Sequence, residues 1–485
     1  MIPSTAGPAD ILQAAVACHH AGQLTDARKL YERLLRKNPR DPNALNLLGV
    51  LLASTGEATR GIQLIRRALT VLPDFPDALS NLGKALLDSN QPEAARVSCE
   101  RALRLTPDDP ETLNTLGNVL LALGRPAEAL PCYQRATAAR PDYNEALMNE
   151  GLALLALGHL PEAWQRYEHR WRLARMGHVP GGPAPGHHGL TGHDPAHHGQ
   201  GSAAPRWTGT QPLPGRTILL HAEQGLGDTL QFCRYALLVA ARRALVVLAV
   251  QPPLVRLMRS LGPLEGTPGN IQVMTQGEPL PAVDFQCPLM SLPGAFGTTV
   301  DDIPAPVPYL HPDPAQVEAW RDRLASYPGP RVGLVWAGNP RRGDPEANAV
   351  DQRRSMKLTA LAGLEGVFVS LQKGDPAREA RRPPAGMRLV DWTSDLHDFA
   401  DTAALTAALD LVIGVDTSVI HLAGAVGTPV WVLNRYDRCW RWLRGRADTP
   451  WYPGMRLFTQ SEPGNWDGVL SDVRVALADF RTAHG

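Results

Sequence analysis

A repeat of fixed length in the first third of this 485-residue chain restricts what the chain can fold into. Proline recurs every 34 residues, and two leucines and a glycine recur with the same period; these are Pro39, Pro73, Pro107 and Pro141, Leu45, Leu79, Leu113 and Leu147, Gly49, Gly83, Gly117 and Gly151, and Leu52, Leu86, Leu120 and Leu154. Leucine and glycine at helical spacing let two antiparallel helices approach closely, and proline ends the second helix. Because one such pair cannot cover its own apolar face, the pattern predicts helix pairs stacked into a solenoid.

The repeat resembles the tetratricopeptide repeat (TPR), with about five copies over residues 8–175, the first weakened by Ala15 at the glycine position. The resemblance implies that the array binds a protein or peptide in its concave face. Five asparagines are expected to face that groove, where carboxamides can hydrogen-bond an extended peptide backbone; they are Asn46, Asn81, Asn114, Asn118 and Asn149. The alternative is a solvated polar face, because fold alone does not fix function.

Residues 176–206 are rich in glycine, proline and histidine, a composition that cannot build a core and predicts a flexible linker. Its histidine pairs, 187–188 and 197–198, could bind a metal adventitiously, but no cysteine or acidic cluster accompanies them. We therefore expect no specific metal site.

Apolar, β-rich runs alternate with helical stretches from Trp207 onward, which favours parallel sheets with crossover helices. We predict two Rossmann-like α/β halves, residues 207–330 and 331–485, so that the whole is an α plus α/β multidomain chain. Ligands of open α/β sheets bind at the carboxyl ends of the strands. The turns that follow the predicted strands are therefore the candidate sites.

The first such turn holds Gly225, Gly227 and Asp228, between strand 217–222 and the next helix. The glycines let a ligand approach the backbone. Neither the third glycine of a dinucleotide fingerprint nor a Walker lysine is present, which disfavours a dinucleotide oxidoreductase. Asp228 is predicted either to accept a proton as a general base or to cap the helix.

The second turn follows strand 411–415 and opens helix 418–426 with Asp416, Thr417 and Ser418, one turn before His421. First-turn N–H groups there predict an anion site for a diphosphate. The alternative is capping residues beside a satisfied core histidine.

Two further turns lie on the same predicted edge. Lys373 follows strand 367–371 and could contact a phosphate as a point charge. Gly338 and Asn339 follow strand 332–336 and could hydrogen-bond a donor substrate.

The Gly227-Asp228 turn and the Asp416-Thr417-Ser418-x-x-His421-Leu422-Ala423 motif resemble glycosyltransferase family 9, the heptosyltransferase-like enzymes of GT-B fold, over about residues 215–480. The combination with TPR repeats is similar in layout to protein O-GlcNAc transferases. The resemblance implies a nucleotide-sugar donor held by the second half at residues 416–421, inversion at the anomeric carbon, and Asp228 as base. Ser418 departs from the family's usual glycine.

No Asp-x-Asp motif occurs anywhere in the chain, which fits a transferase that uses no metal. The sequence therefore predicts an inverting, metal-independent glycosyltransferase with no cofactor, its nucleotide sugar being a substrate, and with TPR repeats recruiting an acceptor or partner protein. The alternative is a non-catalytic TPR scaffold with a nucleotide-sugar-binding domain. The run from Tyr436 to Trp451 is interpreted in one of two ways. It is either a surface for an anionic or lipid-linked acceptor or for stacking a nucleotide base, or a loop and helix packed beside the cleft.

Charge, hydropathy and cysteine usage limit the remaining classes of partner and cellular location. Lys plus Arg and Asp plus Glu both number 48, which argues against a nucleic-acid partner. No run reaches the length of a membrane span, although peripheral membrane contact stays open. The six cysteines form no CxxC pair and the start shows no secretory signal, so a cytoplasmic protein with reduced thiols is expected.

Overall fold

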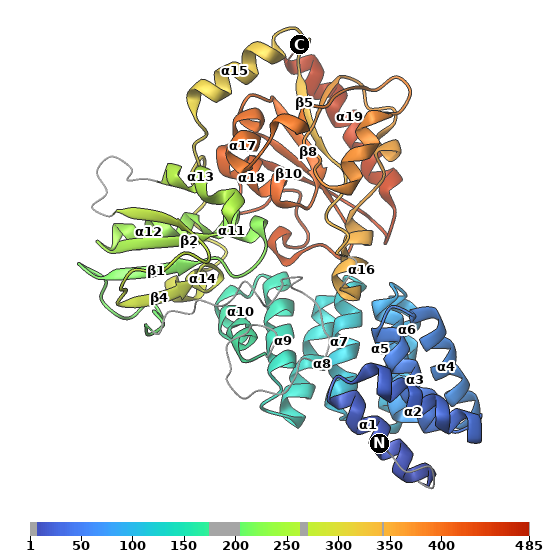
Figure 1. The fold of residues 1–485 in the computed structure, drawn as a ribbon. Coiled ribbons are helices and arrows are strands. Elements are labelled where there is room, and N and C mark those ends of the chain that lie inside the picture. Colours follow the sequence, from blue (N-terminus) through green and yellow to red (C-terminus); the bar gives the residue numbers. More distant parts are fainter. Residues whose placement is uncertain (1–6, 174–203, 262–269, 342–343, 485) are drawn as a thin grey trace. The chain divides into compact units, whose positions relative to one another are not determined.

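Antiparallel helix pairs build the N-terminal part of the computed structural model, which describes residues 7–173, 204–261, 270–341 and 344–484 (Figure 1). Within these residues the pairs are α1 and α2 (Pro8–His20, Leu24–Lys37), α3 and α4 (Pro42–Ser54, Ala58–Val71), α5 and α6 (Pro76–Asp88, Pro92–Leu105), α7 and α8 (Pro110–Ala122, Pro126–Ala139), and α9 and α10 (Asn144–Leu157, Leu160–Tyr167). Proline at the start of several of these helices fits a position that needs no N–H donor.

The repeated glycines sit where the two helices of a pair touch. A Cβ added at Gly49 would lie 2.6 Å from Cγ1 of Ile65 and 2.8 Å from the carbonyl oxygen of Gly61. Cβ atoms at Gly83 and Gly117 would overlap the Cys99 sulfur and the Tyr133 ring. The prediction that glycine removes bulk at the helix contact is therefore confirmed, and the 34-residue period is a packing requirement.

The first sheet of the α/β region has four parallel strands in the order β3-β2-β1-β4. Its strands are β1 (Thr217–His221), β2 (Leu245–Val250), β3 (Ile271–Thr275) and β4 (Phe285–Pro288). In this register Leu219 lies opposite Val247 on one side and Gln286 on the other. Leu219, Val247 and Met274 contribute to a small core on this sheet.

The second sheet has six parallel strands in the order β10-β9-β8-β5-β6-β7. Its strands are β5 (Arg331–Val335), β6 (Val367–Ser370), β7 (Arg388–Val390), β8 (Leu411–Val415), β9 (Val430–Asn434) and β10 (Met455–Thr459). Counted from β5, this is the doubly wound order of nucleotide-binding sheets. The order reverses between β5 and β8, so the carboxyl ends of these two strands mark the crevice where ligands of such sheets bind.

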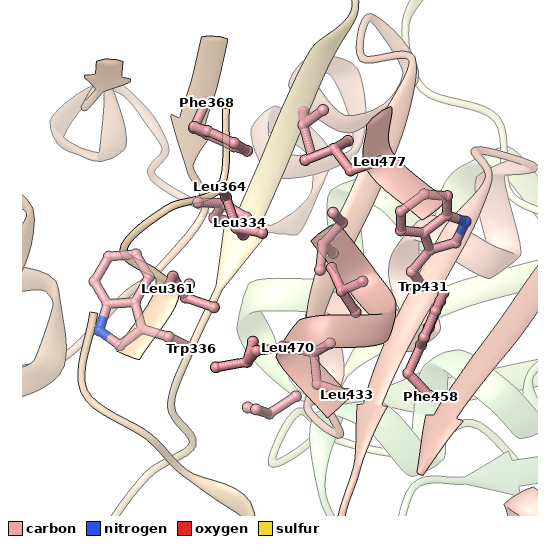
Figure 2. Packing of buried hydrophobic residues seen from close by; sticks show 14 of the residues in the cluster. Leu334, Trp336, Leu361, Leu364, Phe368, Trp431, Leu433, Phe458, Leu470 and Leu477 are labelled. Atoms are coloured by element: carbon pink, nitrogen blue, oxygen red, sulfur yellow. The ribbon is translucent and has the colours of Figure 1, made fainter. Parts of the chain in front are cut away.

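Helices connect and cover the strands of both sheets. They are α11 (Leu226–Phe232), α12 (Arg234–Ala241), α13 (Val255–Met258), α14 (Leu292–Phe296), α15 (Pro314–Leu324), α16 (Pro345–Arg354), α17 (Phe399–Ala407), α18 (Ser418–Val426) and α19 (Trp466–His484). Figure 2 shows the core of the second sheet, where strand side chains such as Leu334, Phe368 and Trp431 gather with Leu470 and Leu477 of α19. This buried cluster gives the second sheet a rigid frame for the loops at its edge.

Contacts divide the chain into two units. The first comprises residues 1–154, 166–192 and 341–349, and the second comprises residues 155–165, 193–340 and 350–485. Within the second unit, the indole of Trp164 donates to the Thr298 carbonyl at 3.0 Å and packs edge-on against Trp440. The second unit therefore includes most of α10 as well as both sheets.

Several predicted elements differ from those observed. The sequence predicts one helix over residues 229–241. The observed helix starts at Leu226 and breaks at Cys233, because the Cys233 carbonyl accepts from the Ala236 amide, an i to i+3 bond. A helix is also predicted near residues 358–364, and the structure has a short 3₁₀ helix there, Leu358–Leu361. Strand Leu411–Val415 and helix Ser418–Val426 have their predicted bounds. The predicted linker, 176–206, lies outside the described residues except for its last three, and the domain bounds stay predictions.

Candidate functional site

The site lies in the second unit, where the N-terminal ends of α11 and α18 meet. Each helix follows the carboxyl end of a parallel strand, β1 for α11 and β8 for α18. A Cβ added at Gly227 would lie 2.9 Å from Cδ2 of His421 and 3.4 Å from Cα of Ser418. Gly227 is therefore needed for contact between two helices, whereas the sequence pattern suggests a close approach to ligand. The contact brings the first half's turn to the second half's motif.

Asp228 is the third residue of α11 and faces two partners. Its carboxylate accepts the N–H of Gly225 at 2.9 Å, so Asp228 caps the helix from its third position, while the N-cap itself is Gly225. The same carboxylate pairs with the guanidinium of Arg441, from the loop after β9. Arg441 is held in place by a 2.6 Å bond from Nε to the Gln231 side-chain oxygen and by stacking on Trp440. Asp228 is thus positioned and charge-balanced from both halves.

His421 is buried within a polar and aromatic shell. Its Nδ1 lies 3.0 Å from the Tyr452 hydroxyl, and its ring stacks on Trp442. Its Nε2 lies 3.9 Å from the Asp416 carboxylate. Burial lowers the pKa of His421 to about 4, against the opposing effect of Asp416. The ring is therefore neutral at pH 7, and both its bonding and its burial fit the interpretation as a satisfied core histidine.

Thr417 is the N-cap of α18, yet its side chain makes no capping hydrogen bond, and its buried hydroxyl oxygen has no partner among the described residues. A helix end without a side-chain cap leaves its first-turn N–H groups for other acceptors. Gly427, with φ of 85°, ends the same helix in the left-handed region that favours glycine.

Arg354 joins two of the predicted turns. Its guanidinium pairs with Asp351 and donates to the carbonyl of Asp416 at 3.1 Å. A side chain at Gly338 would overlap Arg354 and Asp351, so Gly338 is packed closely against this group. The Gly338 amide donates to Ser355 at 2.9 Å, and Asn339 is exposed. The turns after β5 and β8 are thus adjacent, as their shared edge requires.

Lys373 lies on this edge but its ammonium is engaged. It donates to the carbonyls of Thr393 and Leu396 at 2.8 and 2.9 Å. The neighbouring Gln372 accepts from the amides of Trp336 and Ala337 and so ties the end of β6 to that of β5. Phosphate binding by Lys373 stays a prediction, for which one of its three protons remains.

The asparagines of the repeats differ from the expectation. Asn46, Asn114 and Asn149 are only 2–3% exposed. The amide of Asn81 donates to Asn46 at 3.2 Å, and that of Asn149 donates to Asn114 at 3.0 Å. Three of the five are thus buried in bonds that link successive repeats, because an amide that is buried must be hydrogen-bonded. Partner contact by any of the five stays a prediction, and Asn81 and Asn118 are the partly exposed ones.

Sequence reasoning missed Arg441, Arg354 and Tyr452, which hold Asp228, Asp416 and His421 respectively. These partners are between 31 and 213 residues away in the chain, and no local spacing links them. Only Arg441 was indicated by the sequence, because it lies in the arginine-rich run after β9.

Two searches of the described residues are negative. No group of three or more His, Cys, Asp or Glu side chains is placed to hold a metal ion in that part of the chain. None of the helices seen there has the length and apolar character needed to cross a membrane.

Family models for the tetratricopeptide repeat match residues 20–70 and 114–171 in one case and residues 74–142 in another. The N-terminal part, about 170 residues, therefore consists of tetratricopeptide repeats, as predicted. It is followed by an α/β region of parallel sheets and helices. Repeats of this kind are associated with protein–protein interaction.

A curated relative is protein FlbA of Caulobacter vibrioides, 31% identical over 295 residues, covering 57% of this chain and 48% of FlbA. The chain thus spans about half the length of that relative. Similar solved structures include MamA (21% identity, 32% of this chain and 91% of that one, TM-score 0.29). A thermophilic TPR protein of Thermus thermophilus is 23% identical, over 35% of this chain and 92% of that one, with a TM-score of 0.32.

Proposed function

We propose that this protein is an inverting, metal-independent glycosyltransferase of family 9 type and GT-B fold, which moves a sugar from a nucleotide-sugar donor to an acceptor hydroxyl. Asp228 accepts the proton of the attacking hydroxyl. The N-terminal turn of α18 receives the leaving diphosphate, with Asp416, Thr417, Ser418 and His421 around it. Lys373, Gly338 and Asn339 complete the donor side.

The observation that carries the proposal is the contact of Gly227 with Ser418 and His421, which puts a carboxylate and a helix N-terminus on either side of one small region. An acid–base group and an anion-stabilising dipole are the two devices that an inverting transfer needs. The uncapped Thr417 supports the second device, because the N–H groups of that turn have no side-chain acceptor. The absence of Asp-x-Asp from the sequence supports stabilisation by dipole and cations.

The tetratricopeptide repeats are proposed to recruit the acceptor protein or another protein partner. Solenoids of this kind present an extended concave surface for such contacts. The exposed and partly exposed polar groups of the repeats, Asn81 and Asn118 among them, are the groups available for peptide backbone recognition.

A panel of nucleotides and nucleotide sugars tests the donor side by thermal shift. A donor that binds the folded protein raises its melting temperature by mass action. At a ligand concentration a hundred times Kd, the free energy of unfolding rises by about 2.7 kcal/mol. Ser418→Asp is the sharp variant: a carboxylate in the first turn favours the helix but repels a diphosphate. We expect it to fold normally and bind the donor at least tenfold more weakly, with Ser418→Ala as control. Unchanged affinity in Ser418→Asp contradicts the donor site.

One observation favours a second candidate, a TPR scaffold that binds a nucleotide sugar without catalysis. The Asp228 carboxylate already has two partners, the Gly225 amide and the Arg441 guanidinium. A carboxylate engaged by two donors has fewer lone pairs free to accept a proton from an acceptor hydroxyl. Donor binding without any transfer or hydrolysis identifies the scaffold.

A further inference from the structure

Residues 435–446, which follow β9, carry five arginines and are called the arginine loop here. Its two tryptophans, Trp440 and Trp442, are buried, as is Trp451 just beyond it, so the aromatic residues belong to the core and form no exposed patch. Arg441 pairs with Asp228, and Arg446 forms a surface pair with Asp448. Arg435, Arg438 and Arg444 remain to be explained.

Asp437 is the acidic side chain within the arginine loop. It is already paired with Arg353 at 2.9 Å and with Arg435 at 3.5 Å. Arg438 reaches only the carbonyl of Leu443, at 3.5 Å, and its buried Nε has no partner among the described residues. Arg444 forms no hydrogen bond and no ion pair with any residue that the structure describes. Two guanidiniums thus pair with Asp437, Arg444 interacts with it only through charge, and Arg438 has the charge of Arg444 nearby.

This arrangement is unfavourable by itself. Partial burial lowers the pKa of both Arg438 and Arg444, and the charge of Arg444 lowers that of Arg438 further. Leu443, immediately before Arg444, has a φ of 46°, a left-handed conformation that costs a branched, buried residue free energy. Strained backbone of this kind clusters at active and ligand-binding sites, and a bound anion would relieve the repulsion between Arg438 and Arg444.

We propose that Arg435, Arg438 and Arg444 of the arginine loop form a binding site for a phosphate group. Guanidinium groups bind phosphate through paired N–H bonds, and several of them match its double negative charge better than the single charge of a carboxylate. That the phosphate belongs to a substrate rests on the proposed function. That the arginine loop binds a phosphate group does not depend on it. The molecule that carries this phosphate is either the donor or a phosphorylated acceptor. Arg441 of the same loop contacts Asp228, so a substrate bound at the loop lies near the proposed base.

Titration of the full-length protein with inorganic phosphate at constant ionic strength tests the site, by calorimetry and by melting temperature. We expect saturable binding in the wild type and at least a tenfold loss of affinity in the double variant Arg438→Gln, Arg444→Gln. Arg446→Gln is the matched control from the same loop and should change affinity less than twofold. Without phosphate, the double variant should melt no lower than wild type, because it removes repulsion; this also shows that it folds.

The outcomes separate cleanly. Equal phosphate affinity in wild type and double variant, or no saturable binding in wild type, overturns the site. If the double variant also no longer binds a nucleoside diphosphate, the site holds a phosphate of the donor. If its affinity for the nucleoside diphosphate is unchanged, the site holds a phosphate of the acceptor. Phosphate binding that depends on Arg438 and Arg444, with no nucleotide sugar bound by wild type, leaves this site standing while the proposed function fails.

Discussion

Helices α11 and α18 both begin at the carboxyl end of a parallel strand, β1 and β8, but their N-terminal ends differ. In α11, the carboxylate of Asp228 accepts the amide proton of its own N-cap, Gly225. In α18, the N-cap Thr417 gives the helix no side-chain acceptor. The α11 end has a carboxylate in its first turn, whereas the α18 end has one only before its N-cap, at Asp416, whose carboxylate lies 3.9 Å from Nε2 of His421. The difference teaches that the first helix end holds its carboxylate in place, and it is the reason why we propose the second as the end that receives an anion.

The largest expected effect comes from removing the charge on the α11 side. If Asp228 is the base, Asp228→Asn should lower transfer by roughly 10²–10⁴ while donor affinity is kept, because an amide cannot accept the proton. Turnover and donor binding are measured on the same preparation. Asp448→Asn breaks a surface pair with Arg446 and is the control, with an expected cost of about 0–1 kcal/mol in unfolding free energy. Full transfer by Asp228→Asn would remove the contrast between the two helices.

The next effect concerns pH and His421, on the α18 side. The folded-state pKa of His421, about 4, is below the usual value of 6.5 because burial disfavours the charged ring. The unfolded chain therefore binds the proton first as pH falls. Stability that is fully present above pH 6.5 should be lost progressively toward pH 4, by up to about 3 kcal/mol.

Melting curves of wild type and His421→Gln between pH 7 and 4 measure this. The charged groups near the ring, Asp416, Asp228, Arg441 and Arg234, are present in both proteins. We expect the wild type to lose more stability than the variant over this range. Parallel pH profiles would mean that the ring is accessible to protons in the folded protein.

Gly227→Ala sharpens the comparison by pushing the two helix ends apart. Its Cβ would lie 2.9 Å from His421, too close for ordinary contact, and the expected cost is about 1–3 kcal/mol in unfolding free energy. Denaturant unfolding measures it. Gly454→Ala, where an added Cβ meets nothing within 4 Å, is the matched control and should change stability by about 0.5 kcal/mol or less. A neutral Gly227→Ala speaks against the close contact of α11 with α18.

The smallest expected effect is that of Thr417→Ala. Losing a threonine N-cap usually costs about 1 kcal/mol. Here the cost should be about 0.5 kcal/mol or less, since the hydroxyl makes no capping bond. Asp41→Ala is the contrasting variant, because Asp41 is the N-cap of α3 and accepts from the Ala44 amide, so it should show the full capping effect. Equal losses in the two variants would show that α18 is capped after all.

Prediction from sequence succeeded for elements whose structure is encoded by residues close together in the chain. The helix pairs followed from the 34-residue period, and helix Ser418–Val426 from polar caps before an apolar run that ends at a glycine. It failed for β3, β4 and β10, three short edge strands that were not predicted at all. A short strand depends on its neighbours in the sheet, and the local sequence does not record them.

The candidate site shows the same division. The sequence by itself placed Asp228 and the residues around Thr417 at strand ends, because strand, turn and helix are encoded by neighbouring residues. Only the tertiary structure decided that Arg441 faces Asp228, that Tyr452 faces His421, and that three of the asparagines lie buried between repeats. These contacts join residues distant in the chain, and their energies depend on burial and approach distances that appear only when the sheets and helices have packed.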